Sequence, residues 1–122
     1  MKKFYKQTTP FIVPADNGKL IEEHFGQSTR DLLSLVQMIA LSGWSEPFQT
    51  PDFDEYTYVI RGKKQIVIDG ETLVLNDGES IRIDKGTRVQ YSNPFKEACE
   101  YISVCLPAFS VDRVNREEQK SI

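Results

Sequence analysis

The chain has 122 residues and a formal net charge of −3, with 27% charged residues. This length fits one domain, residues 1–122, which buries roughly two-thirds of its unfolded surface. The sequence shows no basic stripe of the kind that binds nucleic acid and no apolar run long enough to cross a bilayer. Since MKKFYKQTTPF lacks the apolar core of a signal peptide, we expect a cytoplasmic protein with no nucleic-acid or membrane partner.

The first part of the chain predicts short strands separated by turns. FIVP precedes the turn signal ADNG, and KLIEEHF at residues 19–25 is a strand candidate that Gly26 closes. Residues 27–41, QSTRDLLSLVQMIAL, are ambiguous. Their front part fits a helical turn capped by Ser28 or Thr29, whereas alternation in their rear part fits a strand buried on both sides.

The second part predicts strands more firmly. EYTYVIRG is rich in residues that favour a pleated sheet. KKQIVIDGETLVL predicts a hairpin with Asp69 and Gly70 at its tip, because Asp-Gly between alternating strands is a strong hairpin signal. Seven or more short strands in all predict an all-β sandwich or barrel. The remaining segments are the strands IRI, RVQYS and EYISVCLPAF, the last stopped by Pro107, and a polar tail at 110–122 that is a short helix or frayed.

The two cysteines, Cys99 and Cys105, lie six residues apart in one predicted strand. An extended segment of that length separates them by about 20 Å, whereas a disulfide needs Cα atoms within about 7 Å. We therefore expect no bridge between them, which agrees with a reducing compartment. The expected state of Cys105 is a small apolar core thiol.

Two segments carry a distinctive spacing of glycines and polar residues. Residues 43–62 read glycine, five residues, Gln-Thr-Pro, three residues, glutamate, six residues, glycine. Residues 78–93 read glycine, five residues, Asp-Lys-Gly, two residues, valine, three residues, asparagine. These spacings match the two cupin motifs, so the chain resembles a small single-domain cupin. The resemblance implies an antiparallel double-stranded β-helix, the jelly-roll barrel.

Shorter segments narrow the resemblance. GWSEPFQTP, FDEYT and CLPAFS resemble a group of stand-alone cupins of unsettled function. The pattern SEP, DEY and glycine is also similar to the cupin half of ethanolamine-utilisation proteins.

The resemblance implies a metal site in which most of the ligands are replaced. Metal cupins use histidines and a glutamate, which suit Fe, Mn, Ni, Cu or Zn. Here the two histidine positions of the first motif hold Gln49 and Pro51, and that of the second motif holds Val89. Only Glu55 is kept. We therefore expect no metal ligands and no cofactor, with a weak metal site at Glu55 and Gln49 left open.

Strand alternation selects candidate ligand-binding residues. Positions 49, 51, 55 and 57 share one face, which should be the barrel interior. That face carries Gln49, Glu55 and Thr57, with Tyr91 expected to join them from the second motif, and Phe53 and Val89 as apolar wall. Arg82 and Arg88 flank the second turn, where one could bind a carboxylate ligand or both could be solvated. Asn93 is expected to be a turn residue, and the role of His24 stays open.

Three functions remain open at this point. The first is metal-independent binding of a small polar or carboxylated metabolite in the barrel. The second is a metal-free isomerase or lyase with Glu55 as its catalytic acid–base. The third is a dimeric structural or interaction module. We expect a homodimer, because Tyr56, Tyr58 and Ile60 should face outward and a monomer rarely exposes a large apolar patch.

Overall fold

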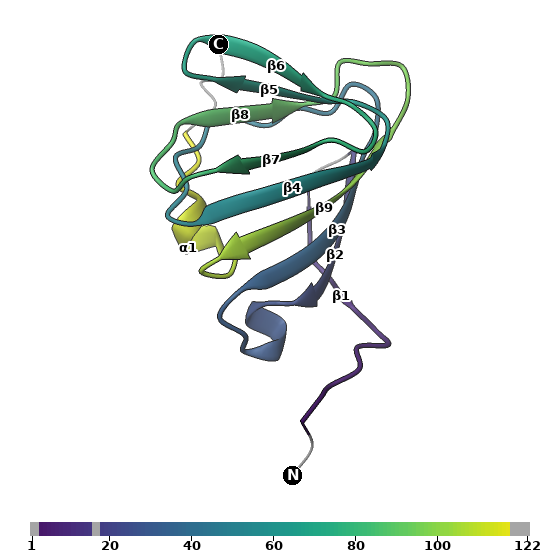
Figure 1. Ribbon diagram of the computed structural model, residues 1–122, viewed down its shortest axis with the longest axis vertical. Helices are drawn as coiled ribbons and strands as arrows, with labels where there is room; N and C mark the ends of the chain where they lie inside the picture. The colour runs from purple at the N-terminus through teal and green to yellow at the C-terminus, as the bar shows by residue number, and fades with distance from the viewer. Residues whose placement is uncertain (1–2, 16–17, 118–122) are drawn as a thin grey trace.

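The computed structural model describes residues 3–15 and 18–117 (Figure 1). Those residues form an all-β structure with one 3-10 turn and one short helix. In chain order the elements are β1 (Phe11–Ile12), β2 (Lys19–Phe25), η1 (Gln27–Thr29), β3 (Ser34–Ala40), β4 (Asp54–Arg61), β5 (Lys64–Ile68), β6 (Glu71–Leu75), β7 (Ser80–Ile83), β8 (Val89–Ser92), β9 (Cys99–Leu106) and α1 (Val111–Val114).

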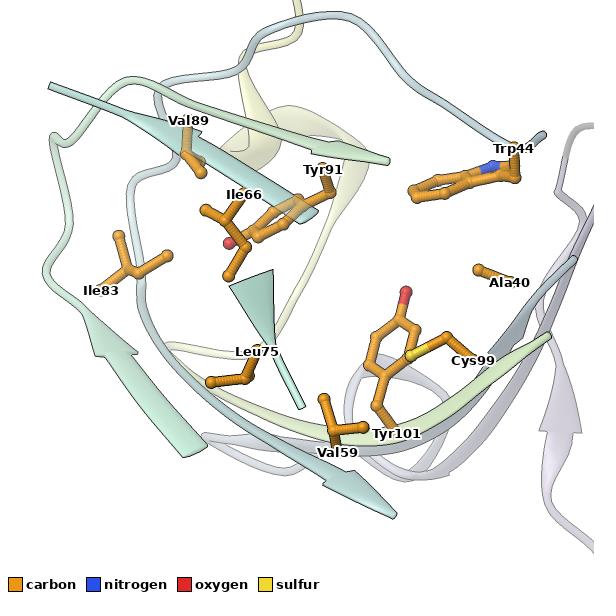
Figure 2. Close-up of a cluster of buried hydrophobic side chains, with 10 residues drawn as sticks. All are labelled: Ala40, Trp44, Val59, Ile66, Leu75, Ile83, Val89, Tyr91, Cys99 and Tyr101. Carbon is orange, nitrogen blue, oxygen red and sulfur yellow. The ribbon is translucent and has the colours of Figure 1, made fainter. Parts of the chain in front are cut away.

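Two antiparallel sheets make the barrel. The larger sheet has the order β1-β2-β3-β9-β4-β7, and the smaller has the order β6-β5-β8. In Figure 1 the smaller sheet lies above the larger one, and α1 lies at the left end of the barrel. Side chains from both sheets meet in a core that includes Val59, Ile66 and Tyr101 (Figure 2). The predicted antiparallel jelly-roll barrel is confirmed.

The ambiguous segment at 27–41 contains both of the structures expected of it. Its front is the 3-10 turn η1 and its rear is the strand β3. The prediction that Ser28 or Thr29 caps this turn was wrong. The capping position is Gly26, whose N–H donates to Thr29 Oγ1 at 2.9 Å.

The predicted hairpin tip is confirmed. Asp69 and Gly70 have φ values of 50° and 74°, as a type I′ turn requires. At the other end of the chain, the polar tail contains α1, which Ser110 caps by accepting a hydrogen bond from the Arg113 N–H. Residues 118–122 of that tail lie outside the described residues.

The outer face of the larger sheet is apolar where it was expected to be. Tyr56, Tyr58 and Ile60 of β4 are exposed, at 48%, 47% and 38%. Val104 and Ile102 of β9 lie opposite Tyr56 and Tyr58 in the register and are half-buried. Both cysteines are buried free thiols on one strand. No helix of the described residues is long and apolar enough to cross a membrane.

Glycine is required at the two ends of the first motif for different structural reasons. Gly43 and Gly62 both adopt positive φ, at 87° and 90°. A Cβ on Gly62 would lie 2.5 Å from the Ala98 carbonyl oxygen and 2.9 Å from the Cys99 Cα. A Cβ on Gly43 would meet nothing within 4 Å. Gly62 is therefore needed for close backbone approach as well as for its dihedral angle.

We predict that Gly62→Ala destabilises the fold more than Gly43→Ala. Each change carries the left-handed backbone cost of about 1–2 kcal/mol. Gly62→Ala adds an overpacking cost of about 1–3 kcal/mol, because backbone atoms must move. Urea unfolding of the two variants checks this, and equal losses of unfolding free energy would contradict it.

Candidate functional site

A cavity of about 50 Å³ lies inside the barrel. This volume is well above the roughly 10–15 Å³ that a cavity needs to hold one water molecule. Its wall is rich in charged and phenolic groups for an interior site. These are Lys19, Lys64, Arg116, Glu23, Glu46, Glu55, Tyr91 and Tyr101.

Three of the predicted site residues meet in this cavity. Gln49, Glu55 and Tyr91 all line it. The Tyr91 hydroxyl donates to Glu55 Oε1 at 2.8 Å, which joins β8 to β4. Gln49 pairs through its backbone with Val89, and its Oε1 accepts from Arg116 Nε at 3.3 Å. Strand alternation also predicted that Pro51 would face the barrel interior with Gln49. Pro51 is buried but does not line the cavity, because residues 50–53 do not form a continuous strand.

Thr57 and Val89 are buried inside the barrel as expected, but neither is among the residues that line the cavity. Thr57 is buried, and its hydroxyl pairs with the Ser103 hydroxyl at 3.0 Å. Ser103 lines the cavity and Thr57 does not. Val89 is fully buried in the core cluster, whereas Phe53 does line the cavity.

The structure does not bring Arg82 and Arg88 to the cavity. Arg82 lies opposite Tyr56 in the register, on the outer face, and its Nε is 3.0 Å from Asp84 Oδ1. Arg88 forms a two-pronged pair with Glu117, with N–O distances of 2.6 and 2.8 Å. The predicted ligand-binding role of both arginines therefore finds no support in their positions.

The remaining sequence candidates have ordinary surroundings. Asn93 is a turn residue as predicted, because its Oδ1 accepts from the Phe95 N–H at 3.1 Å. His24 is half-buried outside the cavity lining, while its neighbour Glu23 contributes to that lining. Cys105 lines the cavity, but burial raises the pKa of its thiol far above the usual range, with Glu55 adding to the effect. Cys105 is therefore a protonated thiol at neutral pH.

Lys64 is the main site residue that the sequence argument missed. Its side chain is buried, with 4% of the residue exposed, and it leaves β5 toward the cavity. The Nζ atom lies 3.6 Å from the ring centroid of Tyr101 and 4.3 Å from that of Tyr91. The ring of Trp44 is 6.0 Å away. The amine is thus enclosed by aromatic faces.

The charge state of Lys64 is set by opposing effects. Burial, helped by the nearby cation Lys19, lowers the pKa of its amine from 10.5 to about 7, against the opposing effect of Glu55 and Glu46. The aromatic faces also favour the charged form, because each ring carries negative charge on its face. At neutral pH the Lys64 amine is therefore protonated in part of the molecules and neutral in the rest.

A second lysine and an arginine share one carboxylate on the cavity wall. Lys19 Nζ lies 3.7 Å from Glu46 Oε2, and Arg116 Nη2 lies 3.1 Å from the same oxygen. Lys19 also lies over Trp44, 4.3 Å from the ring centroid. Burial lowers the pKa of Lys19, which Glu46 opposes. Glu46 thus partly compensates two cations at once.

Tyr101 supplies a hydroxyl without a partner. Its Oη is the buried side-chain polar atom that lacks a hydrogen bond within residues 3–15 and 18–117. Figure 2 shows this hydroxyl pointing from β9 into the barrel, toward the side that carries Trp44. Burial raises the pKa of the Tyr101 phenol well above its usual value, so it remains a hydrogen-bond donor. An unmade bond of this kind costs about 1–3 kcal/mol.

Strand alternation did contain a signal for both missed residues. Lys64 shares its face of β5 with Ile66, which is fully buried. Tyr101 shares its face of β9 with Cys99 and Ser103, which are also buried. A lysine in phase with core residues is unusual, because lysines are almost never fully buried without a partner.

The donor set does not fit the metal that cupin motifs imply. Glu55 is engaged by the Tyr91 hydroxyl, and Gln49 is engaged by Arg116. The other two motif positions, Pro51 and Val89, carry no donor atom in their side chains. Across the residues that the structure describes, no three His, Cys, Asp or Glu side chains cluster in a way that could hold a metal ion.

The buried amine predicts an unusual pH dependence. Since the folded-state pKa of Lys64 is lowered, the unfolded chain binds more protons between pH values of about 7 and 10.5. The wild type should therefore gain stability as pH rises through that window. We predict that Lys64→Met is more stable than wild type at pH 6, by a few kcal/mol at about 1.4 kcal/mol per pKa unit. This advantage should shrink toward pH 10.

The matched control is Lys63→Met, which changes an exposed neighbouring lysine. Chemical denaturation at several pH values measures the difference between each variant and wild type. A Lys64→Met difference that does not vary with pH would contradict the prediction.

Comparison with known proteins supports the fold and leaves the function open. The chain is 28% identical to the EutQ protein of Clostridium difficile, over 76% of this chain and 66% of that one, with a TM-score of 0.62. It shares the fold of the polyketide cyclase RemF from Streptomyces resistomycificus, with a TM-score of 0.76 at 17% identity, over 98% of this chain and 88% of that one.

A curated relative is similar at higher identity. The chain is 41% identical over 111 residues to the endoribonuclease YbeY of Myxococcus xanthus, which covers 89% of this chain. The chain spans only 38% of the length of that relative. The Cupin domain family itself matches residues 36–105, which include both motifs and most of the strands. The chain therefore belongs to the cupin family.

Proposed function

We propose that the barrel cavity binds a small polar, carboxylate-bearing metabolite without the help of a metal. The observation that carries this proposal is the unpartnered Tyr101 hydroxyl, which lies with the enclosed Lys64 amine on the cavity wall. A carboxylate accepts a hydrogen bond from a phenol and compensates an ammonium group. It would therefore satisfy both groups at once.

The distribution of charge in the cavity favours an anion at this point. Lys19 and Arg116 are paired with Glu46. The ion pairs found among the described residues do not include Lys64. A bound carboxylate would thus supply the counter-charge that the protein does not place within ion-pair distance.

Glu55 has a different part in the proposal. One of its oxygens accepts the Tyr91 hydroxyl, and its side chain lines the cavity. A carboxylate in that position suits a hydroxyl or amine of the ligand. The same contact favours a second candidate function, a metal-free isomerase or lyase in which Glu55 moves a proton.

The name of the Myxococcus xanthus relative does not extend to this chain. The match covers 38% of that protein, so its activity can reside outside the matched part. We continue to expect no nucleic-acid partner, given the formal net charge of −3.

Tyr101→Phe separates a binding role from a structural one. Removing an unpartnered hydroxyl should leave the unfolding free energy unchanged or raise it. Losing a donor to a charged ligand should weaken binding by about 10- to 100-fold, the equivalent of about 1.5–3 kcal/mol. Calorimetric titration with pyruvate and acetate, with acetamide as the uncharged comparison, measures the second effect, and denaturation measures the first.

Glu55→Gln is the companion variant. If Glu55 serves the ligand, this change should weaken binding of a hydroxylated acid such as lactate and leave stability nearly intact. If Glu55 is structural, the melting temperature should fall while binding is kept. Failure of pyruvate, acetate and lactate to bind the wild type would contradict the proposal. About one transition-metal ion per purified chain would contradict its metal-independent part.

We also propose that a second copy of the chain covers the outer face of the larger sheet. Tyr56, Tyr58 and Ile60 are exposed there, beside the half-buried Ile102 and Val104. A contiguous apolar face of this kind is unusual on a monomer.

Tyr58→Glu should therefore shift the protein from dimer to monomer in sedimentation at micromolar concentration. The control is Leu32→Glu, because Leu32 is 82% exposed but lies in the loop before β3. A wild type that sediments only as a 14.0 kDa species would refute the dimer.

A further inference from the structure

We propose that Lys64 forms a reversible imine with the carbonyl carbon of a small 2-oxo acid bound in the cavity. This inference rests on the proposed function, because it names the class of ligand and the bond that it makes. An ion pair does not account for the burial of this lysine, because none of the ion pairs within residues 3–15 and 18–117 includes Lys64.

The first requirement is an amine that is neutral for part of the time. Lys64 is enclosed by the rings of Tyr101 and Tyr91, and a second cation, Lys19, belongs to the same cavity. Desolvation and a neighbouring cation are the two means by which proteins activate a lysine as a nucleophile. The lowered pKa of about 7 agrees with this geometry. The titratable and charged groups that face the amine are Lys19, Glu46, Glu55, Tyr91, Cys99 and Tyr101.

The second requirement is a group that recognises the acid part of the ligand. The Tyr101 hydroxyl has no partner and points into the barrel (Figure 2). It can donate to a carboxylate whose neighbouring carbonyl then lies toward Lys64. A cavity of about 50 Å³ points to a small acid, such as pyruvate or glyoxylate.

The third requirement is a path for protons, and the reaction balances without any redox partner. The neutral amine nitrogen attacks the carbonyl carbon, and the carbonyl oxygen becomes a hydroxyl as a proton passes from nitrogen to oxygen. The hydroxyl of the resulting carbinolamine then takes up a proton and leaves as water, and the nitrogen gives up its remaining proton, which leaves a neutral carbon–nitrogen double bond. The hydrogen-bonded pair of Tyr91 and Glu55 is placed on the cavity wall to relay these protons.

Borohydride trapping tests the inference. The protein is incubated with pyruvate at pH 8, reduced with sodium cyanoborohydride and weighed by intact-protein mass spectrometry. A trapped imine adds the mass of one pyruvic acid less one oxygen atom. Peptide mapping with fragmentation then assigns the modified residue, which must distinguish Lys64 from the adjacent Lys63.

The expected result is one saturable adduct at Lys64, formed at least 10-fold faster than on any exposed lysine. Lys64→Met should lose the adduct, and Lys63→Met should keep it. If Lys64→Met does not fold, the wild-type map alone decides the assignment. Trapping should fall between pH 8 and pH 6 as the amine becomes protonated.

Two results would overturn the inference in distinguishable ways. Pyruvate that binds by calorimetry but leaves no adduct at Lys64 would refute the imine and leave the proposed carboxylate site standing. Absence of the adduct, together with failure of pyruvate, acetate and lactate to bind, would overturn the inference and the proposed function. An adduct confined to exposed lysines would refute the imine at Lys64.

Discussion

The interior of this barrel is organised around a lysine that has been removed from water. Desolvation of an ammonium group is expensive, and proteins meet that cost by pairing the charge, by releasing the proton or by surrounding it with aromatic faces. Here Lys64 lies between Tyr101 and Tyr91, with Lys19 and Glu55 on the same cavity wall. Burial and Lys19 lower the pKa of Lys64 while Glu55 raises it, and the result is a pKa of about 7.

The cupin barrel keeps its framework in this chain, while the positions at which the motif resemblance implies metal ligands carry other residues. The motif glycines turn the chain, and Gly62 in addition permits the close approach of the Ala98 and Cys99 backbone. The ligand positions instead hold Gln49, Pro51 and Val89, of which Gln49 joins the network at Arg116.

Sequence reasoning was reliable for features that depend on local chemistry. The Asp69-Gly70 tip, the motif glycines and the inward Tyr91 all follow from turn preference or from strand alternation. It failed for Arg82, because alternation in β7 carries that side chain to the outer face. It missed Lys64, which shares its face of β5 with the buried Ile66, because lysines are almost never fully buried without a partner. The contact between Lys64 of β5 and the ring of Tyr101 of β9 joins strands of different sheets, and no local sequence pattern specifies such a contact.

The central claim is that the Lys64 amine is buried in the barrel and titrates near neutral pH. Carbon-13 labelling of the lysine ε-carbons, followed by NMR titration from pH 5 to pH 11, tests it directly. We expect one resonance to titrate near pH 7, to vanish in Lys64→Met and to shift when pyruvate is added. A spectrum in which every lysine titrates near the ordinary value of about 10.4 would contradict the account.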